Sequence, residues 1–159
     1  EFVLMGRTAY LPLFAAPAAA DKAIAAEALD YVGFARSSDR PVFDLSSGER
    51  RLVLIARALA QQADVLVLDE PTTFLDPKHE TGVMELARRL AEEQHKTVII
   101  TLHNLDLAVR HAGRIVFLKE GRVVADGPPA DILSEDLLGR VYDIPMQIID
   151  HGGRRFIVK

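Results

Sequence analysis

Two adjacent acids, Asp69 and Glu70, are the residues of this sequence best suited to chemistry. They follow an apolar run, Val65–Leu68, that shows no polar alternation and is typical of a strand buried on both faces of a parallel sheet. Open α/β sheets bind ligands beyond the carboxyl ends of such strands. Because neighbouring strand residues point to opposite sides, one acid could hold a metal ion while the other faces a reacting group. A merely solvated acid pair is an equally good interpretation of these two residues alone.

A histidine, His103, follows a second apolar run, Thr97–Leu102. The segment between the two runs, Pro77–Gln94, has an apolar stripe at helical spacing. Strand, helix and strand in this order predict a right-handed crossover and adjacent parallel strands. His103 is therefore expected near the sheet edge that carries the acid pair. A lone histidine at a strand end is usually structural, but this placement makes His103 a better candidate for the site.

A candidate anion site precedes the first strand, in the run Leu45-Ser46-Ser47-Gly48-Glu49, which leads into a helical pattern ending at Gln61. Ser46 and Glu49 have the spacing of a capping box, so a well-started helix is the simpler interpretation. A helix amino terminus also exposes unpaired N–H groups and a positive dipole end. Serine side chains and a glycine that allows close approach would suit a phosphate there.

Further elements must position these residues. A helix is expected from Asp21, as N-cap, to Val32, with Gly33 as the glycine after its end. The alanine-rich start, residues 1–20, is interrupted by two prolines and cannot form one long helix. The remaining predictions are a loop at Ser37–Pro41, a helix at Leu105–Ala112, a hairpin with strands Arg114–Lys119 and Arg122–Asp126, a helix at Ala130–Val141, and a terminal hairpin with strands Gln147–Asp150 and Arg155–Val158 around Gly152-Gly153.

The composition is that of a folded globular chain. Its 159 residues are 49% hydrophobic with a formal net charge of −4, so there is no basic excess to favour nucleic acid. The absence of cysteine excludes disulfides and thiolate metal sites. No apolar run approaches the roughly 20 residues that span a bilayer.

These segments, in this order and spacing, resemble the nucleotide-binding subunit of an ABC transporter. Leu45–Glu49 is similar to the family signature, Val65–Glu70 to its Walker B strand, Thr73–Asp76 to its D-loop and His103 to its switch histidine. Four motifs in register make the resemblance specific, and it covers essentially the whole chain. The segments that most resemble subunits of iron–siderophore, haem or vitamin B12 importers are Met5-Gly6-Arg7, Leu105–Arg114 and Asp126–Tyr142.

The resemblance implies an α/β fold, namely the C-terminal part of a P-loop NTPase (RecA-like) parallel-sheet core with an attached helical subdomain and a small C-terminal β-hairpin region. Residues 1–62 would form the helical subdomain with the signature helix, and residues 63–159 the part of the ATPase core. No Gly-x-x-x-x-Gly-Lys-Ser/Thr occurs in the sequence, so it contains no Walker A loop. We therefore expect a portion of a longer subunit that does not hydrolyse ATP unaided.

The cofactors that the resemblance implies are ATP and Mg²⁺. Asp69 would bind Mg²⁺ directly or through water, Glu70 would act as general base, and His103 would contact the γ-phosphate. Asp76 would couple the two sites of a dimer. In trans, the nucleotide of the opposite subunit would be contacted by the signature residues Leu45, Ser46, Ser47, Gly48 and Glu49.

The implied partners are a second ABC subunit, paired head to tail, and a transmembrane permease that is contacted chiefly through the helical lobe, with no nucleic acid. The implied location is cytoplasmic, peripheral on the inner face of the cell membrane. Without the rest of the core, the strands of Val65 and Val98 would expose an apolar face, so the fragment is expected to self-associate. Two alternatives stay open: a non-catalytic permease-docking or dimerisation module, and a soluble ABC-type ATPase of DNA repair or translation.

Overall fold

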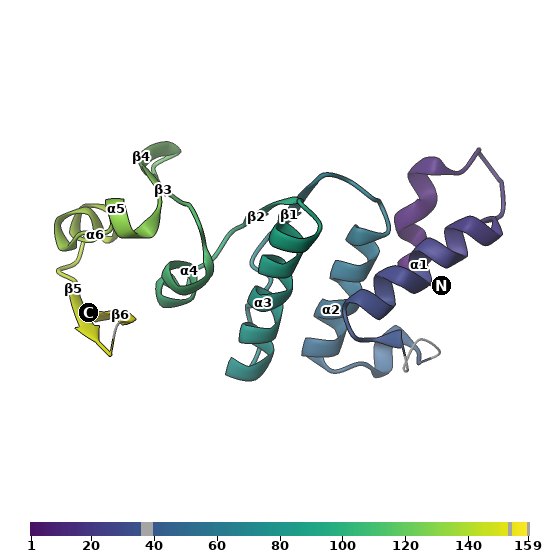
Figure 1. The fold of residues 1–159 in the computed structure, drawn as a ribbon, viewed down its shortest axis with the longest axis horizontal. Helices are drawn as coiled ribbons and strands as arrows, with labels where there is room; N and C mark the ends of the chain where they lie inside the picture. Colours follow the sequence, from purple (N-terminus) through teal and green to yellow (C-terminus); the bar gives the residue numbers. More distant parts are fainter. Residues whose placement is uncertain (36–39, 153, 159) are drawn as a thin grey trace. The chain divides into compact units, whose positions relative to one another are not determined.

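Strands β1 (Val65–Leu68) and β2 (Thr97–Ile100) pair in parallel and are joined by helix α3 (Pro77–Glu93), which confirms the predicted crossover unit (Figure 1). The structure is a computed structural model that describes residues 1–35, 40–152 and 154–158. It divides into unit 1, residues 1–101, and unit 2, residues 102–159. The division into a helical part, 1–62, and a core part, 63–159, stays a prediction.

Strand β2 ends two residues earlier than the sequence predicts. The ladder continues until Thr101 N donates to the Leu68 carbonyl at 3.0 Å. The next ladder bond would run from Glu70 N to the Thr101 carbonyl, but Glu70 N donates to the Thr101 side chain instead, at 2.9 Å. A side-chain oxygen therefore replaces a backbone acceptor and ends the strand pair.

Unit 1 begins with a helical part made of η1 (Val3–Tyr10), α1 (Ala19–Tyr31), the short η3 (Val42–Asp44) and α2 (Ser47–Leu59). The prediction of Asp21 as N-cap is wrong, because α1 begins at Ala19 and Asp21 lies inside its first turn. There Asp21 Oδ2 accepts the Ala18 amide at 3.1 Å, while Oδ1 is occupied by Arg7. Gly33 follows the helix with φ of +77°, as expected of a glycine past a helix end.

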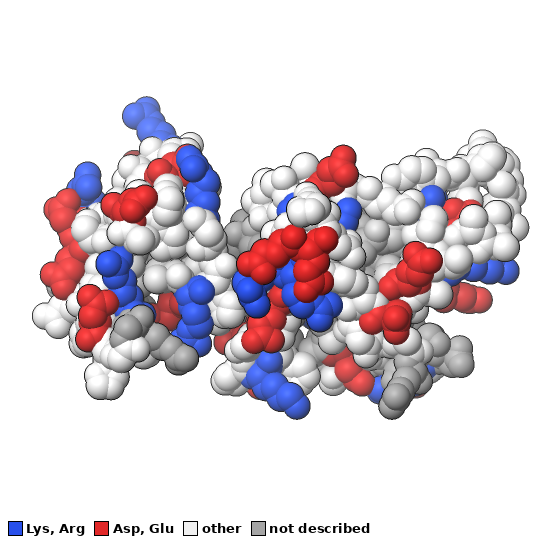
Figure 2. Space-filling model, viewed as in Figure 1, with Lys and Arg blue, Asp and Glu red and all other residues white. Residues whose placement is uncertain are grey.

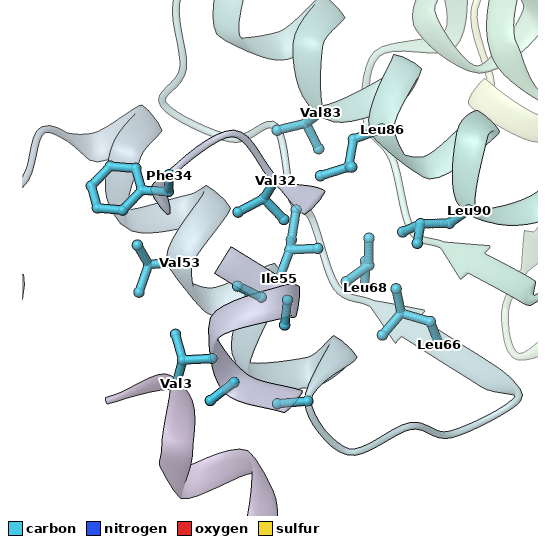
Figure 3. Packing of buried hydrophobic residues seen from close by; sticks show 14 of the residues in the cluster. Val3, Val32, Phe34, Val53, Ile55, Leu66, Leu68, Val83, Leu86 and Leu90 are labelled. Atoms are coloured by element: carbon cyan, nitrogen blue, oxygen red, sulfur yellow. The ribbon is translucent and has the colours of Figure 1, made fainter. Parts of the chain in front are cut away.

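The core of unit 1 lies between the helical part and one face of the strand pair (Figure 3). Val83, Leu86 and Leu90 of α3 point toward this core, into which β1 sends Leu66 and Leu68. The hydrophobic stripe predicted for α3 is thus its buried face, and its Arg88 and Glu92 pair on the exposed face at 3.0 Å.

The other face of the strand pair is open. Val65, Val67 and Ile99 are 51%, 64% and 50% exposed, whereas Val98 and Ile100 pack against the core. Both strands therefore alternate between buried and exposed side chains. Burial on both faces, which the apolar runs alone predicted, is wrong, and the expectation of an exposed apolar face on this strand pair is confirmed. No further strand joins this pair among the described residues.

A buried arginine links the helical elements of unit 1. Arg7 Nε donates to Asp21 at 3.1 Å, and its Nη1 donates to the Ala60 carbonyl and to Gln62 Oε1, both at 2.9 Å. The guanidinium also lies 4.1 Å from the centroid of the Tyr10 ring. One side chain thus joins η1 to the start of α1 and to the end of α2.

The described residues of unit 2 form three helices and two hairpins, with bounds α4 (Leu105–His111), β3 (Ile115–Lys119), β4 (Arg122–Gly127), α5 (Pro129–Ile132), α6 (Glu135–Tyr142), β5 (Gln147–His151) and β6 (Arg154–Val158). The first hairpin turns at Glu120-Gly121 with both φ angles positive, as predicted. The terminal hairpin is confirmed as well.

The single helix predicted over Ala130–Val141 is wrong. Leu133 leaves the helical region after α5, and Ser134 caps a new helix, α6, by accepting the Leu137 amide at 3.2 Å. A serine hydroxyl competes for backbone amides and so favours a helix start over a helix interior. The predicted loop residues 37–39 and Gly153 lie outside the described residues.

Charge is mixed over the surface. Lys and Arg side chains are interspersed with Asp and Glu on the face of each unit that Figure 2 shows. Among the described residues, no helix has the length and apolar character needed to cross a membrane.

Candidate functional site

The acid pair at the end of β1 is held by the hydroxyl of Thr101, the residue that follows β2. The register aligns Leu68 with Ile100, so Thr101 stands beside Asp69. Thr101 Oγ1 accepts the Glu70 amide at 2.9 Å and donates to Asp69 Oδ1 at 2.6 Å. The two acids and the strand end are therefore fixed together.

Glu70 has an uncommon backbone conformation, with φ of +43° in the left-handed region. A non-glycine residue there is strained, and such strain gathers at functional sites. The Glu70 carboxylate accepts from Thr73 Oγ1 at 3.0 Å, and the Glu70 carbonyl accepts from Thr73 N at 3.3 Å. A tight turn thus fixes where the Glu70 side chain points.

Asp76 caps helix α3. Its Oδ1 accepts the amides of Lys78 and His79, both at 3.0 Å, and its Oδ2 lies 2.7 Å from His79 Nδ1. The His79 amide, followed by the His79 ring, lowers the pKa of the Asp76 carboxyl below its ordinary value. Asp76 is thereby kept ionised and oriented.

The predicted capping box is present at the start of α2. Ser46 Oγ accepts the Glu49 amide at 3.2 Å, and Glu49 Oε2 accepts the Ser46 amide at 2.8 Å. Arg40 donates to Glu49 Oε1 at 2.6 Å. The Ser46 amide first, and then Arg40, lower the pKa of Glu49. Phosphate binding by Ser46 and its exposed neighbour Ser47 stays a prediction.

Gly48 makes a close approach to the His79 side chain of α3. A Cβ added at Gly48 would lie 2.4 Å from Cδ2 of the His79 ring. Only glycine lets the ring pack directly on this backbone. The signature run and the turn after β1 therefore meet within unit 1, and Leu45 is buried beneath them.

His103 belongs to unit 2, where it is exposed just before α4. Asn104 begins this helix by accepting the Leu107 amide at 3.1 Å. The role of His103 beside Glu70 stays a prediction.

Asp69 fits a magnesium ligand by its chemistry. Mg²⁺ takes oxygen ligands and is commonly bound by one or two carboxylates together with phosphate and water. Asp69 presents an exposed carboxylate beside the Thr101 hydroxyl. Among the described residues no group of three His, Cys, Asp or Glu gathers, which is compatible with a site completed by phosphate.

Sequence reasoning gave no role to Thr101 or His79, and it placed Thr73 in the D-loop without its contact to Glu70. The register could have revealed Thr101, because Val65 and Thr97 start in step and the fifth residues of both runs are then Asp69 and Thr101. Thr73 and His79 each stand three residues after an acid in a turn or first helical turn, which is the spacing of side-chain capping. The contact of His79 with Gly48 has no local signal.

Comparison with known proteins identifies the family of the chain. The model of the family described as "ABC transporter" matches residues 4–73, a span that holds the signature run and the acid pair. The hemin import ATP-binding protein HmuV of Rhodococcus jostii is 47% identical over 152 residues, covering 95% of this chain and 51% of that protein. The chain belongs to the ABC transporter family.

Other ABC proteins agree with this assignment. The ferric enterobactin transport ATP-binding protein FepC of Escherichia coli is 37% identical, over 94% of this chain and 55% of that protein. The structure of a "metal-chelate type ABC transporter" in an inward-facing conformation matches with a TM-score of 0.90 and 33% identity, over 99% of this chain and 63% of that chain. The dimeric ABC transporter cassette MJ0796 matches with a TM-score of 0.65 and 30% identity, over 79% of this chain and 54% of that chain.

These ABC cassettes confirm the predicted fold class, the α/β core of a P-loop NTPase with parallel strands and small hairpins. The chain spans about half the length of the curated relatives that it matches.

Proposed function

We propose that the chain is part of the ATP-hydrolysing subunit of an ABC importer for haem, iron–siderophores or cobalamin. The acid pair held by Thr101 at the end of β1 carries this proposal, because it offers a magnesium ligand and a general base in one fixed turn. The printed functions of the Rhodococcus and Escherichia relatives, hemin import and ferric enterobactin transport, support the substrate class.

The two acids would have different roles. Asp69 would hold Mg²⁺ with its exposed carboxylate, and when bound the ion would neutralise phosphate charge. Glu70 would accept a proton from the attacking water, with its carboxylate aimed by Thr73. His103 would donate a hydrogen bond to the γ-phosphate.

The signature would serve a second subunit. Ser46, Ser47 and Gly48 stand at the positive end of α2, where backbone amides favour an anion. Asp76, at the start of α3, would couple the two nucleotide sites of a head-to-tail dimer. The dimeric cassette among the structural matches supports such pairing.

The helical part of unit 1 would contact a transmembrane permease from the cytoplasmic face of the membrane. Leu13 and Phe14, in the loop between η1 and α1, are 86% and 97% exposed. Large apolar side chains that protrude in this way favour a protein contact. This feature also suits the second candidate, a docking module without catalysis.

A chimera tests the catalytic proposal. The first half of the Rhodococcus relative is joined to this chain in place of its own second half, and ATPase activity is measured with and without Mg²⁺. We expect Mg²⁺-dependent turnover by the chimera, its loss in Glu70→Gln, and none by the 159-residue chain alone. The Glu80→Gln variant, an exchange on α3, is the matched control and should keep the activity.

Two outcomes would contradict this proposal. A folded chimera that binds ATP but does not hydrolyse it would remove the catalytic role of the acid pair. Turnover by the chain alone that Glu70→Gln abolishes would show that no Walker A loop is needed.

Permease binding separates the two candidate functions. Binding of the chain to the membrane subunit of a haem importer should weaken in the double variant Leu13→Ser, Phe14→Asn, in which asparagine suits the positive φ of residue 14. Tight binding by the chimera that is indifferent to ATP and to Glu70→Gln would favour the docking module.

A further inference from the structure

His79 contacts both motifs to which the proposed function gives a role toward the second subunit: the signature, which would reach the opposite nucleotide, and the D-loop, which would couple the two sites. Its Nδ1 lies 2.7 Å from Asp76 Oδ2 in the D-loop. The opposite side of the ring packs on Gly48 of the signature, at a distance that excludes any Cβ. We infer that His79 is a positioning residue that locks the D-loop to the signature helix, an inference that rests on the proposed function.

Packing alone does not fix the ring. A groove of about 570 Å³ opens beside it, lined by Gly48, Gly82 and Leu52 among others. A Cβ added at Gly82, on the next turn of α3, would meet nothing within 4 Å. The ring therefore has room to turn away, and the bond to Asp76 selects the conformation that touches Gly48.

The backbone on each side is also determined. Gly48 lies in the first turn of α2, whose start is closed by the Ser46–Glu49 capping box. Asp76 is held by the Lys78 and His79 amides at the start of α3. The imidazole thus connects two capped helix starts, so that a displacement of one is passed to the other.

The consequence concerns closure of a dimer on nucleotide. Signature and D-loop would reach the opposite nucleotide as one rigid unit, with their separation already set in the single subunit. Pre-organisation of this kind lowers the entropy that must be lost when the reacting groups are aligned.

Amide hydrogen exchange on the 159-residue chain tests the coupling without ATP. Gly48→Ala, which pushes a methyl group into the ring, should speed exchange about tenfold at the amides of residues 76–79 other than Pro77, which has no amide hydrogen. In the His79→Ala background the same Gly48→Ala change should have no such effect. Amides of residues 86–90 on α3, and the Lys78→Ala variant, are the controls for general destabilisation.

Two substitutions separate the two contacts. His79→Asn keeps a donor for Asp76 but removes the ring from Gly48, whereas His79→Phe keeps a ring and removes the donor. Each should abolish the effect of Gly48→Ala on residues 76–79, since the coupling needs both contacts. In an active chimera, both should also lower kcat roughly tenfold, while Lys78→Ala does not.

The inference is overturned if Gly48→Ala leaves residues 76–79 unchanged, or changes them equally with and without His79. It is also overturned if the exchange coupling is present but kcat is the same in all His79 variants of an active chimera. An inactive chimera with intact exchange coupling would instead contradict the proposed function and leave the contact between the motifs standing.

Discussion

At the scale of single residues, the site depends on small polar groups next to the acids. Thr101 Oγ1 accepts a hydrogen bond from the Glu70 amide and donates one to Asp69 Oδ1. Asp76 is kept ionised by the amide and ring of His79. The acids could be recognised from the sequence, because they follow a strand directly, but the residues that orient them come from another strand or from the turn itself.

Replacing Thr101 by valine tests the hydroxyl while keeping the shape of the side chain. The loss of one acceptor and one donor should cost about 1 kcal/mol in the free energy of unfolding, measured by urea denaturation. Thr97→Val, at the start of the same strand, should change the free energy little. In an active chimera, Thr101→Val should also lower kcat. If neither the free energy of unfolding nor kcat changed, the role of the Thr101 hydroxyl in holding the two acids would be contradicted.

Asp76 predicts a pH dependence of stability. Its pKa is lowered in the folded chain, so its contribution is fully present above the unfolded value, near pH 4, and is lost as the pH falls through the folded pKa. Asp76→Asn keeps a capping side chain without the charge. The advantage of the natural chain over Asp76→Asn should therefore be constant above about pH 4 and shrink as the pH falls further, as measured from urea midpoints. A constant difference would contradict the lowered pKa.

At the scale of elements, the sequence predicts local structure well. It predicts poorly which side chains from distant parts of the chain supply hydrogen-bond partners. The α2 capping box, the hairpin at Glu120-Gly121 and the parallel crossover follow from short patterns. Asp21 was misplaced because its partner Arg7 lies 14 residues away. The lack of alternation in the two apolar runs predicts strands buried on both faces, whereas the open face of this pair was expected only from the missing rest of the core.

Among the contacts between the helical elements of unit 1, those of the buried Arg7 should be the most sensitive to substitution. Arg7→Lys cannot reach Asp21, the Ala60 carbonyl and Gln62 together, because an ammonium group lacks the planar fork of guanidinium. A lysine that leaves one of these buried acceptors unpaired should cost about 2 kcal/mol in the free energy of unfolding, which thermal or urea unfolding would measure. Arg88→Ala, which removes an exposed pair on α3, should cost about 0.5 kcal/mol or less. Equal effects of the two changes would show that the Arg7 contacts are not special.

At the scale of the whole molecule, the open face of the strand pair governs association. Val65, Val67 and Ile99 lie exposed next to strand edges that no other described strand covers. Apolar faces with open edges favour pairing with other chains.

We expect the 159-residue chain to form dimers or larger assemblies, measured by size-exclusion chromatography with light scattering. Val67→Lys should shift it toward the monomer, because a charge then lies on the exposed face of β1. Leu118→Lys, at a position 65% exposed on β3 of unit 2, is the matched control and should leave the assembly unchanged. A natural chain that is monomeric at high concentration, or one dissociated only by Leu118→Lys, would contradict this assignment.

The turn after β1 also carries a phenylalanine at its tip. Phe74 is 94% exposed, with φ of +64°, two residues before Asp76. The chain has no tryptophan, so Phe74→Trp would give it a single indole fluorophore at the D-loop. Its emission would be that of an indole in water while the D-loop is open, and would move to shorter wavelength when another subunit covers it. Dimer closure could then be followed in real time by tryptophan fluorescence, separately from ATP turnover.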